Sequence, residues 1–87
     1  MHELSLMADL LRQIEKISRD NDGGRVVAVK VRLGALSHIT PEHLAEHFHQ
    51  SAVGSAADGA RLEVVQMDDH HHPEAQDIIL DSVELAV

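Results

Sequence analysis

The stretch RVVAVKVRLGALSHITPEHLAEHFHQSAV, residues 25–53, decides the fold because its hydrophobic period changes along its length. Its first part, residues 25–33, alternates between two sets of side chains, which is typical of a strand with one apolar face and one wetter face. The expected apolar face carries Val27, Val29, Val31 and Leu33, and the expected wetter face carries Val26, Ala28, Lys30 and Arg32.

The second part of the same stretch predicts a helix. Thr40 is a suitable N-cap and Pro41 suits the first helical position, so the helix should begin there and run to about Val53. Its buried stripe should be formed by residues four apart, namely Leu44, Phe48 and Ala52. The change from a period of two to a helical period therefore predicts strand followed by helix.

The flanking segments complete the domain. Apolar residues at helical spacing predict a helix over residues 4–20, and the turn-forming residues 21–24 end it. Residues 61–67 and 78–87 are rich in Val, Ile and Leu and predict two strands, which we expect to be antiparallel neighbours joined by an exposed loop at about 68–77. The predicted fold is α+β, with two helices packed on one face of a three-stranded sheet in the order α-β-α-β-β. The predicted core is Leu10, Leu11, Ile14, Val29, Val31, Leu44, Phe48, Val64, Val83 and Leu85.

Composition excludes several classes of function. The 87 residues suffice for one small domain, here residues 1–87. A net charge of −8 and a single aromatic residue, Phe48, argue against binding to nucleic acid or to an anionic membrane. The chain has no cysteine, so it offers no thiolate ligand and no cysteine nucleophile. No apolar run approaches a membrane span and no secretory signal is visible, which favours a cytoplasmic location.

Eight histidines are the compositional anomaly. His43 and His47 are four residues apart and share one helix face, a spacing that can place two ligands on one metal ion, but no catalytic glutamate motif accompanies them. We interpret them as solvated or partner-facing. The run His70, His71 and His72 lies in an acidic loop, where a solvated loop is the simpler interpretation and a secondary metal-holding segment is the alternative.

The first residues, MHELSL, suggest a metal site of a different kind. The α-amino group of Met1, the amide nitrogens of His2 and Glu3, and the imidazole of His2 follow one another along the chain, and successive backbone nitrogens close five-membered chelate rings. Ni²⁺ and Cu²⁺ accept such planar nitrogen coordination, whereas zinc prefers tetrahedral side-chain ligands. The alternative is a plain helix start at which Glu3 favours the positive end of the helix dipole. The residues alone leave both interpretations open.

The motifs MHELSL (residues 1–6) and VKVRLGALSHITPEHLAEHF (residues 29–48) resemble the HypA/HybF family of nickel chaperones that mature NiFe hydrogenases. GARLEVV (residues 59–65) and DIILDSVELAV (residues 77–87) also resemble the second and the closing strand of that family. The resemblance implies a nickel metallochaperone and not an enzyme. It also implies that Ni(II) is held by Met1, His2 and Glu3, and that the partners are the GTPase HypB and the hydrogenase large subunit.

One departure from the family is large. The family carries a zinc domain with paired CxxC motifs between the second and third strands, and here only MDDHHHPEAQD, residues 67–77, stands at that place. We therefore expect a single nickel-chaperone-like domain without structural zinc. Whether the loss is natural or engineered, and whether the chain forms a homodimer, stay open. The alternative function is a metal-free docking module of a hydrogenase maturation complex.

Overall fold

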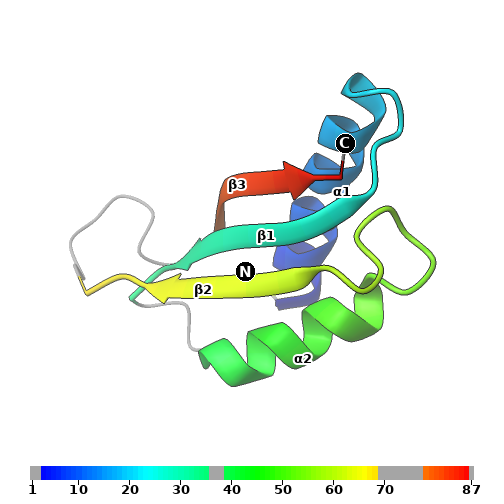
Figure 1. Ribbon diagram of the computed structural model, residues 1–87. Coiled ribbons are helices and arrows are strands. Elements are labelled where there is room, and N and C mark those ends of the chain that lie inside the picture. Colours follow the sequence, from blue (N-terminus) through cyan, green and yellow to red (C-terminus); the bar gives the residue numbers. More distant parts are fainter. Residues whose placement is uncertain (1–2, 36–38, 69–77, 87) are drawn as a thin grey trace.

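The structure, a computed structural model, describes residues 3–35, 39–68 and 78–86. Its elements follow in the order α1 (Glu3–Asp20), β1 (Val26–Leu33), α2 (Pro41–Ser51), β2 (Arg61–Gln66) and β3 (Ile78–Leu85). Figure 1 shows one mixed three-stranded sheet with the two helices against it, and α1 contacts β3 while α2 contacts β2. The predicted α+β class and element order are confirmed. Within the described ranges neither helix is long and apolar enough to cross a membrane.

The sheet order is β2-β1-β3, so β1 is the central strand. β1 is parallel to β2, with Ala28 opposite Arg61, and antiparallel to β3, with Val29 opposite Val83. The prediction that β2 and β3 are antiparallel neighbours is therefore wrong, because β1 separates them. The physical reason lies in burial and connection length. β1 alternates fully buried residues along its length whereas β2 has none, and the helical connection through α2 is long enough to return β2 parallel to β1.

A β-bulge near the start of β1 corrects a second prediction. Val26 lies opposite Leu85 and Ala28 lies opposite Glu84, so Val27 is an extra residue on β1. A bulge shifts the alternation of side chains by one position. As a result Val26 is 1% exposed and Val27 is 39% exposed, the reverse of the faces expected from strict alternation. The Val26 amide also donates a hydrogen bond to the Ala56 carbonyl (3.0 Å), which anchors the strand start to the loop after α2.

The hydrophobic core lies between the sheet and the two helices. Of the ten predicted core residues, Leu10, Ile14, Val29, Val31, Leu44 and Phe48 are buried, and Leu11, Val64, Val83 and Leu85 are partly buried and pack against them. The core also includes residues outside the predicted set: Met7, Val26, Leu33, Ala52, Ala57 and Ala60. Ala52 belongs to the buried stripe expected for α2, whereas no period in the sequence indicates the burial of Ala57 and Ala60 in the loop after α2.

Short polar contacts fix the helix ends and the loop. The Thr40 hydroxyl accepts a hydrogen bond from the His43 amide (3.1 Å), so Thr40 caps α2 as predicted. α2 ends at Ser51, two residues before the predicted end, and Val53 is 71% exposed. The Glu15 carboxylate of α1 accepts a hydrogen bond from the Ala56 amide (2.8 Å) and thereby ties α1 to the loop after α2. These contacts cap the start of α2 and attach the loop that follows it to α1.

Candidate metal centre

The expected nickel ligands lie at the start of α1. Met1 and His2 are outside the described residues, and α1 begins at Glu3. The first four N–H groups of a helix have no intrahelical acceptor, so the Glu3 amide is not committed to the hydrogen-bond ladder of α1. Met7 is 3% exposed one turn further on, which shows that α1 is packed on the core near its beginning. The helix start is therefore attached to folded structure.

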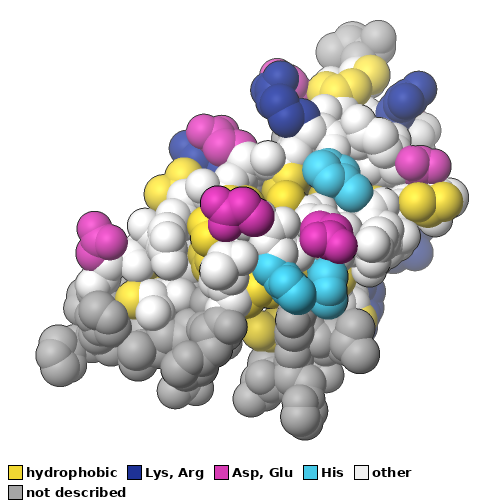
Figure 2. All heavy atoms as spheres, turned by 90° about the horizontal axis from the view of Figure 1, so that it is seen from below, with side chains coloured by type: hydrophobic (Ala, Val, Ile, Leu, Met, Phe, Trp, Pro, Cys, Tyr) yellow, Lys and Arg dark blue, Asp and Glu magenta, His cyan; other side chains and the backbone are white. Residues whose placement is uncertain are grey.

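The histidines that the structure describes all belong to α2. Figure 2, which looks at the molecule from below Figure 1, shows histidine side chains gathered together with acidic ones on this side of the molecule. The imidazole centroids of His43 and His47 are 4.3 Å apart, with a tilt of 42° between the ring planes. The His49 ring makes an edge contact with the Phe48 ring, and the two ring centroids are 5.6 Å apart.

The outer part of α2 is thus a histidine pair flanked by carboxylates. Glu42 and Glu46 are exposed, His43 is exposed and His47 is half-buried, and the helix sequence PEHLAEHFHQS contains no lysine or arginine. Among residues 3–35, 39–68 and 78–86, no three histidine, aspartate or glutamate side chains are grouped so that they could hold one metal ion. From the described part of the chain, His43 and His47 can therefore supply two ligands, which is fewer than the four of a closed structural site. His70, His71 and His72, the expected secondary segment, lie outside the described residues.

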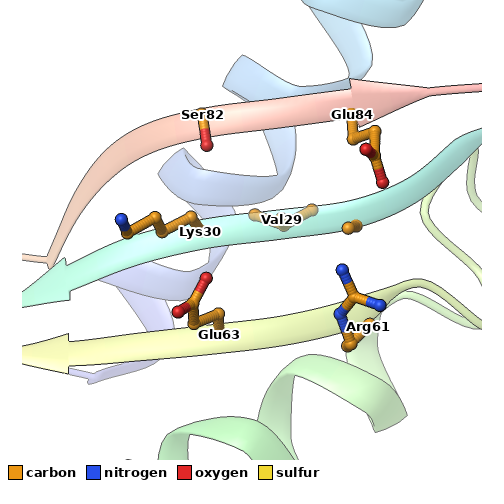
Figure 3. A pocket seen from close by; sticks show the side chains of 7 residues that line it. Val29, Lys30, Arg61, Glu63, Ser82 and Glu84 are labelled. Carbon is orange, nitrogen blue, oxygen red and sulfur yellow. The ribbon is translucent and has the colours of Figure 1, made fainter.

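The open face of the sheet carries a polar surface that sequence reasoning missed. This face has a shallow depression with a volume of about 140 Å³. Figure 3 shows the side chains that line it, which include Lys30, Arg61, Glu63 and Glu84. A second irregularity in the sheet pairs Lys30 with Ser82 and Val31 with Leu80, which leaves Asp81 as an extra residue on β3.

Asp81 has two cationic neighbours on β1. Its carboxylate lies 3.9 Å from the Lys30 ammonium and 3.7 Å from Arg32 Nε. These separations are longer than charge-assisted hydrogen bonds and all three side chains are more than one third exposed, so the pairs contribute little to stability. In the sequence, this polar face is indicated by charged residues two apart, which are Lys30 and Arg32 on β1 and Arg61 and Glu63 on β2. Among the residues that the structure describes, those that line the depression include no histidine.

The fold is a small α+β domain that solved structures share. A solution structure of the Ni metallochaperone HypA from Helicobacter pylori superimposes with a TM-score of 0.78, covering 98% of this chain and 97% of that chain. A second solution structure of a HypA protein gives a TM-score of 0.75. The sequence identities are only 17% and 19%, so these likenesses show the fold alone.

The sequence comparisons give the family. The chain belongs to the HypA family, since the family model described as hydrogenase/urease nickel incorporation metallochaperone matches residues 1–72. Hydrogenase maturation factor HypA of Rhodopseudomonas palustris strain BisB5 is 42% identical over 67 residues, which are 77% of this chain and 59% of that protein. The corresponding protein of Methylocella silvestris is 41% identical over 64 residues, 74% of this chain and 57% of that protein. The chain thus spans somewhat more than half the length of these relatives. The family description is that of a metal carrier, in agreement with the prediction that the protein is not an enzyme.

Proposed function

We propose that this protein carries Ni(II) for hydrogenase maturation and holds the ion at its N-terminus through Met1, His2 and Glu3. The observation that carries the proposal is the family match over residues 1–72, which includes these three residues. The remaining proposals follow from it: a single metallochaperone domain, delivery of the ion to a hydrogenase large subunit, and docking to a HypB-like GTPase. A cytoplasmic location, where such maturation would take place, stays a prediction.

The chemistry of the terminus supports nickel as the cargo. When Met1 carries the free amine, this nitrogen and the amides of His2 and Glu3 can lie in one plane around the ion, and the His2 imidazole is close enough along the chain to add a further nitrogen ligand. Ni²⁺ suits nitrogen ligands in such tetragonal geometry. Two deprotonated amides would neutralise the ion, so the positive end of the α1 dipole would not repel the complex strongly. Because α1 begins at Glu3, the Glu3 amide can take part without loss of a helical hydrogen bond.

The test is a calorimetric titration of Ni(II) into tag-free protein, together with the absorption band of planar nickel–nitrogen coordination. The free-terminus protein should bind tightly. A variant with one added N-terminal residue moves the amine away by one peptide unit and should bind far more weakly, as should His2→Ala. Circular dichroism checks that both variants are folded. Equal affinity of the free-terminus and extended proteins would refute the N-terminal site.

A pH series tests the role of the amine separately. The amine must lose its proton to bind, and its unperturbed pKa is about 7.7–8.0, so nickel affinity should rise as the pH rises through neutrality. If no tight nickel binding occurs at any pH, the docking-module alternative is favoured, and binding of a HypB-like GTPase by the metal-free protein is then the measurement to make. Replacing His70, His71 and His72 by Ser should leave the planar absorption band unchanged, because these residues are at most a weaker secondary segment.

A further inference from the structure

We propose that the open face of the sheet is a docking surface for a second copy of this chain. The two copies pack face to face about a two-fold axis, with their β1 strands antiparallel. Such an axis uses the same patch twice, so that when one residue contacts another across the interface, the reverse contact also forms. The inference does not involve the proposed nickel site, because it concerns association of the metal-free protein.

The register of the sheet carries the inference. Strand pairing places six residues of the open face in two neighbouring cross-strand rows. The first row is Arg61, Ala28 and Glu84, and the second row is Glu63, Lys30 and Ser82. A two-fold axis that lies between these rows, across the strands, exchanges the first row with the second. Arg61 then lies opposite Glu63 of the second copy and Glu63 lies opposite Arg61, so both contacts made by β2 join opposite charges.

The shape of the face supports the same axis. The depression of about 140 Å³ is lined by all six residues of the two rows, and in Figure 3 Arg61 and Glu84 reach toward β1 from the two outer strands. Ala28 stands between them at the centre of the first row, where its small side chain leaves the hollow. The axis sets the long Lys30 side chain of the second copy opposite Ala28, next to the Glu84 carboxylate. A projecting cation thus meets a hollow with an anion on its rim.

The charge of this face favours a second copy as the occupant. Its cations are Lys30, Arg32 and Arg61, and its anions are Glu63, Asp81 and Glu84. These six charges cancel, whereas the whole chain carries a net charge of −8. Two copies therefore repel each other through the rest of their surface and least through this face. The separation of 3.9 Å between Lys30 and Asp81 is too long for a charge-assisted hydrogen bond, so the Lys30 side chain can turn toward a second copy.

The size of the face predicts how strong the association is. Three strands form it and β1 has eight residues, so at about 4.8 Å per strand and about 3.3 Å per residue it measures roughly 14 Å by 26 Å. Two copies together would bury roughly 700 Å², which is less than the area of about 1,200 Å² that stable complexes bury. The association is therefore weak and reversible, and the charge pairs mainly set its orientation.

Charge reversal tests the arrangement in protein that a chelator keeps free of metal. Sedimentation equilibrium from about 10 μM to about 1 mM should show the average mass of the wild-type protein rising from that of a monomer toward that of a dimer. Arg61→Glu would place carboxylates opposite each other at both symmetric contacts, and Glu63→Arg would do the same with guanidinium groups. Each change should weaken the association at least about tenfold.

Mixing the two single variants gives the sharpest result. In a mixed pair both contacts on β2 again join opposite charges, so an equimolar mixture of Arg61→Glu and Glu63→Arg should associate about as well as the wild type, as should the chain that carries both changes. Recovery in the mixture also shows that both variants are folded. Arg19→Glu is the matched control, because it alters the net charge as Arg61→Glu does but at an exposed position of α1, and it should associate like the wild type.

Three outcomes would overturn the proposal: a wild-type protein that stays monomeric up to about 1 mM, single reversals that associate as the wild type does, and a mixture of the two that stays monomeric. Nickel plays no part in these outcomes, so they are distinct from failure of the N-terminal site, which would show as absence of the planar absorption band in the free-terminus protein.

Discussion

Val26 and Val27 offer a direct test of the bulge at the start of β1, because they are adjacent, identical and subject to the same substitution. A Val→Ala change removes two methyl carbons, worth about 1.6 kcal/mol at about 0.8 kcal/mol per buried CH₂. Val26 is 1% exposed, so Val26→Ala also leaves a cavity and should cost about 2–3 kcal/mol. Val27 is 39% exposed, so Val27→Ala should cost roughly 1 kcal/mol, with no cavity to add.

The assay is urea unfolding of both variants, followed by circular dichroism. With a slope near 1 kcal/mol per M, the lower end for small domains, the two midpoints should differ by about 1–2 M. Val65→Ala is a matched control because Val65 is also 39% exposed, and it should behave like Val27→Ala. A larger loss for Val27→Ala than for Val26→Ala would mean that β1 alternates without a bulge and that the reasoning is wrong.

Three further predictions concern the core, the loop after α2 and the end of α1. Phe48 is 0% exposed, so Phe48→Ala should cost about 3–5 kcal/mol in urea unfolding, and a loss below about 1 kcal/mol would place the ring on the surface. Glu15→Ala removes the acceptor of the Ala56 amide and should cost about 1.5–3 kcal/mol, whereas Glu15→Gln keeps an acceptor and should cost less; equal losses would show that the bond is unimportant. The hydrogen bond from Lys16 lowers the pKa of the exposed Asp20 carboxyl, so its small stabilising effect is present above the ordinary carboxyl pKa and is lost as pH falls through the lowered one. Asp20→Asn should flatten the acid limb of the stability curve slightly, and curves that coincide from acid to neutral pH would contradict this.

The N-terminus and α2 place their nitrogen ligands in different ways. The proposed N-terminal chelate rests on covalent order, because an amine, two amides and an imidazole are adjacent in any chain that starts with a free Met1 and His2. The α2 pair depends on side-chain rotation, since residues four apart on a helix share a face but their rings need not approach each other. His43 and His47 were expected to be solvated or partner-facing, and the structure places their ring centroids 4.3 Å apart.

What the sequence determined by itself is local. Hydrophobic period placed α1, β1 and α2, the Thr40-Pro41 pair located the start of α2, and the buried stripe through Leu44 and Phe48 followed from residues four apart. These features depend on neighbours along the chain, so one sequence is enough to infer them.

Only the tertiary structure decided the features that depend on distant segments. The pairing of β1 with both other strands, the bulge at Val27 and the burial of Val26 arise from the register between β1 and β3. The bulge residue Asp81 and the hydrogen bond from the Ala56 amide to the Glu15 carboxylate join parts of the chain that carry no shared pattern. Strand order and register are chosen by the total burial that the packed sheet achieves. That total is a property of the whole fold, and no local stretch of the sequence contains it.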